Sequence, residues 1–304
     1  MKRNAALVDI STNIWYNRAY KNKEKYMRNI KIVADSSSDV LRRETIAFSA
    51  APLKIITKDR QFVDDESLNV EEMVAFLGKY KGKSTTSCPN PEEWLSAFGD
   101  AEEIFCVTIT SALSGSYNAA MIAKNQYEQQ NPNSRVCVID SLSTGPEMLL
   151  LIRKIEELYA EGKSFDEISD EVREYQKRTG LLFVLESMNN LANNGRVSKI
   201  SAKLAGVINI RVVGKASDKG ELEPLDKPRG AKMTRIKILE RLDRLGYLGG
   251  RLHITHCLNS EAAEGLRDEV LAKFPNAEVS IDKCGGLCSF YAEKGGMLIG
   301  FEKG

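Results

Sequence analysis

The sequence lacks the features that would place the protein in a membrane, outside the cell or on a nucleic acid. No stretch of about 18 apolar residues occurs in the 304-residue chain, so no segment is predicted to span a bilayer. The only apolar run near the N-terminus, Ala5–Val8, is too short for the core of a secretory signal. Lys and Arg number 43 against 42 Asp and Glu, which leaves no overall field to attract nucleic acid or an anionic membrane. We therefore expect a cytoplasmic protein with no nucleic-acid partner and no stable membrane insertion.

Residues that commonly hold metals or act as bases are also scarce. The two histidines, His253 and His256, lie three residues apart in a predicted strand, where a period of two places them on opposite faces. Each is expected to be structural, and they cannot jointly serve a zinc site or a catalytic centre. The six cysteines are scattered, and Cys284 and Cys288 lack the spacing of common zinc motifs. Reduced, packed thiols are predicted, with metal binding as a less favoured alternative.

What is present indicates a two-domain α/β protein. A chain of this length with 42% hydrophobic and 28% charged residues can bury a sizeable core, and at about 150 residues per domain it suggests two domains. Polar residues dominate 1–26, which we interpret as an N-terminal appendage. Short apolar strands alternate with helices through 27–150, which predicts βαβ units and a mainly parallel sheet. The same alternation recurs in 151–304 and predicts a second α/β domain.

The elements follow from the apolar pattern and from local helix signals. Asn90 and Ser164 each precede a Glu by three residues, which predicts capping boxes, and Pro91 suits the first position of a helix. Helices are predicted at 70–80, 91–98, 115–126, 147–161 and 166–178. Strands are predicted at 30–34, 53–56, 104–108, 136–139, 181–186, 207–213, 252–256 and 277–281.

Small hydroxyl residues follow four predicted strand ends in the first domain. Because ligands bind outside the carboxyl ends of strands in open α/β sheets, these loops are expected to converge on one polar crevice. Ordinary helix capping by Ser, Thr and Asp is the alternative. The four runs are 35–38, 84–87, 110–116 and 140–144.

The third run is the most informative, because Ser114, Gly115 and Ser116 open a predicted helix whose first amides suit an anion. The run matches neither the P-loop nor the dinucleotide fingerprint, so an anion smaller than a nucleotide is expected. An acyl hydrolase or transferase using Ser114 is the alternative. It is disfavoured because Ala112 replaces the first glycine of a G-x-S-x-G elbow and no histidine is placed to act as the base.

A series of short motifs, in order from about Met27 to the C-terminus, resembles the DegV family. Each motif is weak alone, but their order and spacing are specific. The family's members bind long-chain fatty acids and act as the acyl-carrying subunit of bacterial fatty-acid kinase. The motifs are Ile32–Ser37, Thr86–Pro89, Leu113–Tyr117, Val138–Ser141, Asn194–Ser198, Ile208–Arg211 and Lys227–Gly230.

The resemblance implies a DegV-like fold with a parallel-sheet first domain and a mixed sheet in the second. It also implies a protein that is not itself an enzyme and needs no cofactor, but binds a fatty acid and presents its carboxyl group to a separate kinase. The residues implied fall into three groups. The head group is implied to contact Thr86, Ser87, Ser114, Gly115 and Ser116; additional candidates are Ser36 and Lys283; phosphate or kinase contacts are Arg196 and Arg229.

The chain departs from the family pattern in two places. Cys88 stands where the family has Gln, which removes one hydrogen-bonding side chain. The stretch 282–287 contains no His or Pro, whereas the family often has a His followed by Gly-Pro-Gly there. Lys283 either replaces that histidine or lies on the surface. Binding of another small carboxylate or of a regulatory partner therefore remains a further alternative.

Overall fold

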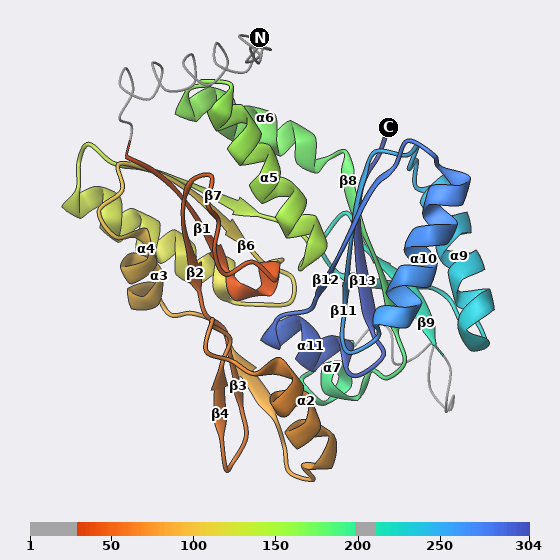
Figure 1. The fold of residues 1–304 in the computed structure, drawn as a ribbon. Helices are drawn as coiled ribbons and strands as arrows, with labels where there is room; N and C mark the ends of the chain where they lie inside the picture. The colour runs from red at the N-terminus through yellow and green to blue at the C-terminus, as the bar shows by residue number, and fades with distance from the viewer. Residues whose placement is uncertain (1–28, 198–210) are drawn as a thin grey trace, which may run out of the picture.

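The computed structural model describes residues 29–197 and 211–304. The described chain forms a four-stranded sheet, a six-stranded sheet and a small three-stranded sheet (Figure 1). The appendage predicted at 1–26, the first residues of the strand predicted at 207–213, and part of two DegV-like motifs lie outside the described residues. Within the described residues, no helix combines the length and apolar character needed to cross a bilayer.

The mainly parallel sheet predicted for the first half is confirmed: each strand pair of the first sheet is parallel, and helices cover both faces. Its strand order is β2-β1-β6-β7. Alternate side chains of β6 serve the two faces: Phe105 packs toward α5 and α6, whereas Ile104 packs toward α3 and α4. The elements are β1 (Ile30–Asp35), β2 (Ala47–Ala51), β6 (Glu103–Thr108), β7 (Arg135–Asp140), α3 (Pro91–Phe98), α4 (Ser116–Gln130), α5 (Pro146–Ala160) and α6 (Phe165–Gln176).

The second sheet is mixed, as the resemblance implied. Its order is β10-β9-β8-β13-β11-β12, and among these described strands only the β11 and β12 pair is parallel. Helices α9 and α10 pack on one face, and part of the other face turns toward the first sheet. The elements are β8 (Thr179–Leu185), β9 (Val212–Ala216), β10 (Leu222–Asp226), β11 (Arg251–His256), β12 (Glu278–Lys283), β13 (Met297–Glu302), α7 (Asn189–Asn193), α9 (Gly230–Arg244), α10 (Ser260–Lys273) and α11 (Gly286–Ala292).

The small sheet corrects one interpretation of the sequence. The run 84–87 was expected to follow a strand end, but β5 (Thr85–Ser87) is itself a strand that pairs antiparallel with β3 (Lys54–Ile56). β3 also pairs with β4 (Gln61–Val63), and helix α2 (Val70–Lys79) connects β4 to β5. The β-branched threonines suit a strand, although their polarity is typical of a turn. Several further elements were not predicted from the sequence: β2, β4, β10, β13, α7 and α11.

Helix α5 joins the two larger sheets. The boundary expected near residue 150 falls inside this helix, which packs on both β6 and β13. Gly300 of β13 makes the close approach possible, because a Cβ at that position would lie 2.6 Å from the backbone of Pro146 and Glu147. Helix α5 is therefore packed closely against both sheets where the two halves of the chain meet.

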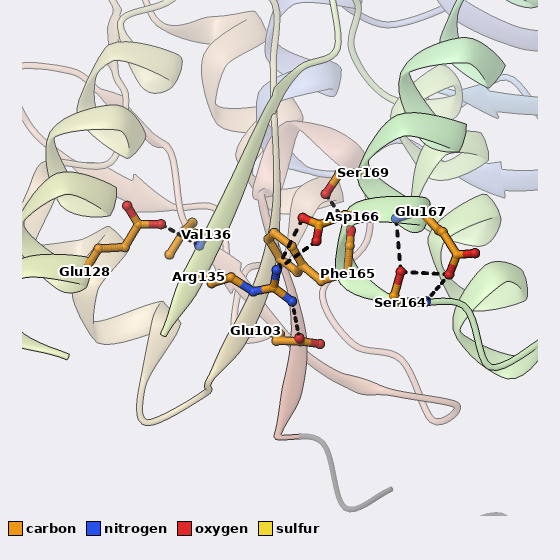
Figure 2. Close-up of polar contacts among 9 residues, drawn as sticks. All are labelled: Glu103, Glu128, Arg135, Val136, Ser164, Phe165, Asp166, Glu167 and Ser169. Atoms are coloured by element: carbon orange, nitrogen blue, oxygen red, sulfur yellow. Dashed lines mark hydrogen bonds and ion pairs between the residues drawn. The ribbon is translucent and has the colours of Figure 1, made fainter. Parts of the chain in front are cut away.

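The start of α6 is fixed by the capping box predicted at Ser164 (Figure 2). The Glu167 carboxylate accepts from the Ser164 amide at 2.8 Å, and Ser164 Oγ accepts from the Glu167 amide at 3.3 Å. Beside it, Arg135 of β7 forms ion pairs with Glu103 at 2.8 Å and Asp166 at 3.0 Å, and its guanidinium lies 4.4 Å from the centre of the Phe165 ring. These contacts tie α6 to the edge of the first sheet.

Two buried carboxylates from the first half of the chain hold the first turn of α11. Asp39, which follows the 3₁₀ turn Ser36–Ser38, accepts from the Gly285 amide at 2.8 Å. Asp64, which follows β4, accepts from the amides of Gly286 at 2.6 Å and Leu287 at 2.9 Å. Amides at a helix start have no partner within the helix, and a negative charge there is favourable. The position of α11 is thereby set by the first half of the chain.

Burial makes these carboxylates sensitive to pH. It raises the pKa of Asp39 to about 7 and that of Asp64 to about 6, although the amide hydrogen bonds oppose the rise. An unperturbed aspartate has a pKa of 3.8. Between these values the folded protein binds more protons at Asp39 than the unfolded chain does. The contribution of Asp39 to stability is therefore greatest at acidic pH and falls as the pH rises toward 7.

We predict that Asp39→Asn gains stability relative to wild type when the pH rises from about 5 to about 7.5. The amide is neutral throughout and keeps an oxygen for the Gly285 amide, so the relative gain should be on the order of 1 kcal/mol or more. Urea unfolding of both proteins at the two pH values measures it. Asp170→Asn, which changes an exposed carboxylate, is the control. An equal stability difference at both pH values would contradict the prediction.

Candidate functional site

A cavity of about 290 Å³ lies at the junction of the two halves of the chain. Loops and strand ends of the first half form one wall, and the face of the second sheet that α9 and α10 leave uncovered forms another. Helix α11 contributes the side chains of Cys288, Tyr291 and Ala292. The carboxylates that fix α11 therefore also position one wall of the cavity.

Hydroxyl groups form the polar wall. Thr86 and Ser87 of β5 and Ser114 and Gly115 before α4 all line the cavity, so four of the predicted head-group residues are brought together. Ser114 Oγ accepts from the Ser116 amide at 3.2 Å, which leaves its own proton available to a ligand. Three members of the hydroxyl runs expected to converge here, although not named as head-group contacts, also line this wall: Thr110, Ser143 and Thr144.

Two predicted contacts, the side chains of Ser116 and Ser36, have structural partners instead. Ser116 Oγ donates to Asp35 Oδ2 at 2.6 Å, and Ser36 Oγ accepts from the Leu53 amide at 3.0 Å. Both side chains are buried, and neither lines the cavity. The Ser116 amide, expected to face the ligand, donates to Ser114 instead.

Asp35 organises the loops beneath the polar wall. Besides Ser116 Oγ, this buried carboxylate accepts from the Ile109 amide at 2.9 Å and from Ser37 Oγ. Burial raises the pKa of Asp35, whereas these hydrogen bonds lower it. The carboxylate thereby ties the end of β1 to the end of β6 and to the start of α4.

The second sheet supplies the apolar wall. Leu181, Phe183 and Leu185 alternate along β8 and share the face that lines the cavity. Phe183 pairs with Gly214 of β9, and a Cβ on this glycine would lie 2.2 Å from the ring. The absence of a side chain at Gly214 therefore lets the aromatic ring lie across the neighbouring strand. The opposite neighbour, Leu298 of β13, continues the apolar surface.

Of the three predicted basic contacts, one lines the cavity and two lie outside it. Arg196 lines the cavity, and its Nε donates to the Leu113 carbonyl at 3.3 Å, so it reaches the Ser114 loop from the second half of the chain. Arg229 precedes α9, is exposed and does not line the cavity. Lys283 also lies outside the cavity, where it pairs with Glu71 at 2.8 Å and lowers the pKa of that exposed carboxyl. Lys283 therefore does not occupy the polar wall.

Sequence reasoning missed Tyr291. Its hydroxyl lies 2.7 Å from Thr86 Oγ1, although the two residues are 205 positions apart. Burial raises the pKa of Tyr291, so the phenol is protonated at neutral pH and is a hydrogen-bond donor. Its neighbours Phe290 and Ala292 are apolar, so the sequence alone makes it resemble a packed core residue. No local signal distinguishes it.

Neither histidine lies beside Ser114. His253 and His256 are both buried on β11, where they contact Ser280 Oγ at 2.6 Å and the Asn259 amide at 3.1 Å, and neither lines the cavity. All six cysteines are free in the structure, and burial raises the pKa of the Cys88 thiol in the cavity wall. In residues 29–197 and 211–304, no group of three or more His, Cys, Asp or Glu side chains is arranged to hold a metal ion.

Comparison with known proteins finds the same family along nearly the whole described chain. Residues 29–303 match the model of the family described as "Uncharacterised protein, DegV family". A DegV domain-containing protein of Streptococcus pneumoniae is 43% identical over 276 residues, which cover 90% of this chain and 98% of that protein.

Two solved structures are similar in both fold and sequence. A DegV family protein from Eubacterium eligens, loaded with heptadecanoic acid, superposes with a TM-score of 0.88 at 42% identity and covers 90% of this chain and 100% of that one. The fatty acid kinase (Fak) B3 protein of S. pneumoniae, loaded with linoleic acid, gives 0.87 at 42% identity with coverage of 90% and 99%. From the family match and these relatives together, the chain belongs to the DegV family.

Proposed function

We propose that the protein binds one long-chain fatty acid in the cavity, with the carboxylate on the hydroxyl wall and the tail on the apolar wall. The observation that carries this proposal is the division of a single cavity into a row of hydroxyls and an apolar sheet face. The acyl chains reported in the two relatives at 42% identity support it. In this arrangement 27–150 supplies the head-group residues, and 151–304 supplies most of the surface for the tail.

The two walls have different roles in binding. Burial of a fourteen-methylene tail at ~0.8 kcal/mol per CH₂ gives on the order of 11 kcal/mol as an upper bound. Each hydrogen bond to the charged head group contributes about 1.5–3 kcal/mol. The tail therefore dominates affinity, whereas the hydroxyls select a carboxylate and fix its orientation.

The hydrogen bonds within the polar wall support Thr86, Tyr291 and Ser114 as head-group donors. Between Thr86 and Tyr291 one hydroxyl donates to the other, and whichever accepts keeps its own proton for the ligand. A chain of two hydroxyls is polarised toward a negative acceptor, which strengthens the terminal donor. Ser114 provides the second donor, because its oxygen already accepts from the Ser116 amide. Tyr291 thus supports Thr86 from α11.

We further propose that the protein presents the bound carboxyl group to a separate fatty-acid kinase in the cytoplasm and is not the catalyst itself. The relative named as a fatty acid kinase B3 protein supports this role. Arg196 lies where it would meet the added phosphoryl charge, and its planar guanidinium suits that group. Arg229, exposed before α9, is proposed as a contact for the kinase surface.

Head-group variants test the binding mode. Thr86→Val, Ser114→Ala and Tyr291→Phe should each weaken binding of palmitic acid about tenfold or more, because each removes or weakens a donor to a charged oxygen. Binding of hexadecanol, which has the same chain and no charge, should change much less. Competition against a fluorescent fatty acid measures both ligands for each variant.

Ser111→Ala is the matched control, since Ser111 lies in the same loop but is exposed and does not line the cavity. If all three head-group variants bound palmitic acid as wild type does, the proposed head-group site would be wrong. If they lost palmitic acid and hexadecanol equally, the residues would act through packing, and their assignment as carboxylate donors would fail.

A kinase assay tests the basic residues. Arg196→Ala should retain fatty acid but lower its phosphorylation by the cognate kinase, because the phosphoryl group loses a charged partner. Arg229→Ala should retain fatty acid and have a smaller effect, as expected for an exposed charge. Arg60→Ala, which removes an exposed arginine paired with Glu72, is the control. If the Arg196→Ala, Arg229→Ala double variant were phosphorylated as wild type is, neither arginine would have the proposed role.

A further inference from the structure

A second, polar crevice of about 710 Å³ lies at the same junction and shares no lining residue with the fatty-acid cavity. The chain after the 3₁₀ turn forms one side, α5 contributes Leu149 and Arg153, and strands β11 and β12 contribute the remaining side. The side chains of His253, Thr255 and Asp282 come from these strands. The function proposed above does not use this crevice.

Arg153 is the distinctive group in the crevice. It is half-buried on α5, yet within the described residues its guanidinium makes no hydrogen bond or ion pair. Glu156, one turn along, is already occupied, because it accepts from Arg43 Nε at 2.7 Å, Arg43 Nη2 at 2.5 Å and Thr45 Oγ1 at 2.6 Å. Charges removed from water are normally paired, so a half-buried guanidinium without a partner is unusual.

The surroundings leave positive charge uncompensated. Arg42 stands at the rim, where it makes no ion pair with a described residue, and Arg43 lines the same crevice. Burial and the charges of Arg43 and Arg251 lower the pKa of Arg153, and burial together with Arg153 lowers the pKa of His253 to about 4. His253 is therefore neutral near pH 7 and does not bind the Asp282 carboxylate 3.4 Å away as a cation.

Three acidic residues also line the crevice and reduce its positive electrostatic potential. Asp282 and Glu66 are exposed at its edge, and Asp282 acts on Arg153 only at longer range than an ion pair. Asp39 lies deeper: its Oδ1 accepts from the Gly285 amide, whereas its buried Oδ2 has no hydrogen-bond partner among residues 29–197 and 211–304. A proton on Oδ2 would turn this oxygen from a repulsive neighbour into a donor for a bound anion.

We propose that this crevice binds a small anion that carries a phosphate group, with the guanidinium groups of Arg153 and Arg42 as its ligands. A guanidinium presents its donors in a planar fork that matches phosphate oxygens. The anion supplies the partner that Arg153 lacks, and Arg42 closes over it from the rim. The volume is sufficient for a phosphate monoester as well as for free phosphate.

Isothermal titration of the full-length protein with inorganic phosphate, at constant ionic strength set with chloride, tests the proposal. Wild type should bind one phosphate saturably. Arg153→Gln should weaken binding about tenfold or more, and Arg42→Gln should weaken it less, because hydrogen bonds to a charged group are strong where water is partly excluded. Arg60→Gln, at an exposed arginine that does not line the crevice, should bind as wild type does.

A parallel titration with glycerol 3-phosphate distinguishes the source of the phosphate group. Tighter binding than inorganic phosphate assigns the crevice to a phosphate monoester, and weaker binding assigns it to free phosphate. The absence of saturable binding of either probe to wild type would overturn the proposal, as would unchanged binding to Arg153→Gln. If Arg153→Gln does not fold, Arg153→Lys replaces it and should also bind more weakly, because lysine lacks the fork.

Discussion

The contact between two buried carboxylates and the first amides of α11 is the constraint on which the binding site depends. Asp39 and Asp64 belong to the first half of the chain, whereas α11 lies near its end. Because the helix carries Cys288, Tyr291 and Ala292 into the cavity, its position sets the shape of that wall. The cavity is therefore assembled only when the two halves have docked. Burial disfavours the charged form of both carboxylates, and it therefore raises their pKa values.

A second buried carboxylate arrangement supports the opposite wall. Asp35 draws together the ends of β1 and β6 and the start of α4, and Ser114 lies two residues before the serine that Asp35 holds. Ser114 keeps its own proton for a ligand, because its oxygen accepts from the Ser116 amide. Across the cavity, alternation along β8 places every second side chain on the apolar face. The polar wall and the apolar wall therefore have different origins. Loops held by Asp35 form the first, and alternate side chains of β8 form the second.

The sequence predicted those parts of the fold that local signals control. Helix α3 begins and ends where expected because Asn90 caps it and Pro91 occupies its first position. The parallel sheet and the convergence of Thr86 with Ser114 follow from apolar strands and the hydroxyl residues near them, and the resemblance added the mixed sheet. Strand β5 was predicted to be a loop after a strand end, since its polar residues mask its pairing with β3.

Contacts between distant segments could not be predicted in this way. Tyr291 meets Thr86 across 205 residues, and Lys283 is held by Glu71 across 212. In a single sequence, nothing marks either pair as partners, because each contact exists only after α11 and β12 have docked on the first half. Ser36 and Ser116 have the residue type of a head-group donor, yet their side chains are turned toward Leu53 and Asp35.

Native mass spectrometry of the full-length protein, purified from bacteria without detergent, tests fatty-acid binding most directly. We expect one bound species per chain with the mass of a fatty acid of about C14 to C18, because burial of such a tail makes release slow. Denaturation should release the species as a free acid, identifiable by its exact mass. A protein that carries no lipid as purified, and still none after incubation with palmitic acid, would contradict the assignment of this cavity to a fatty acid.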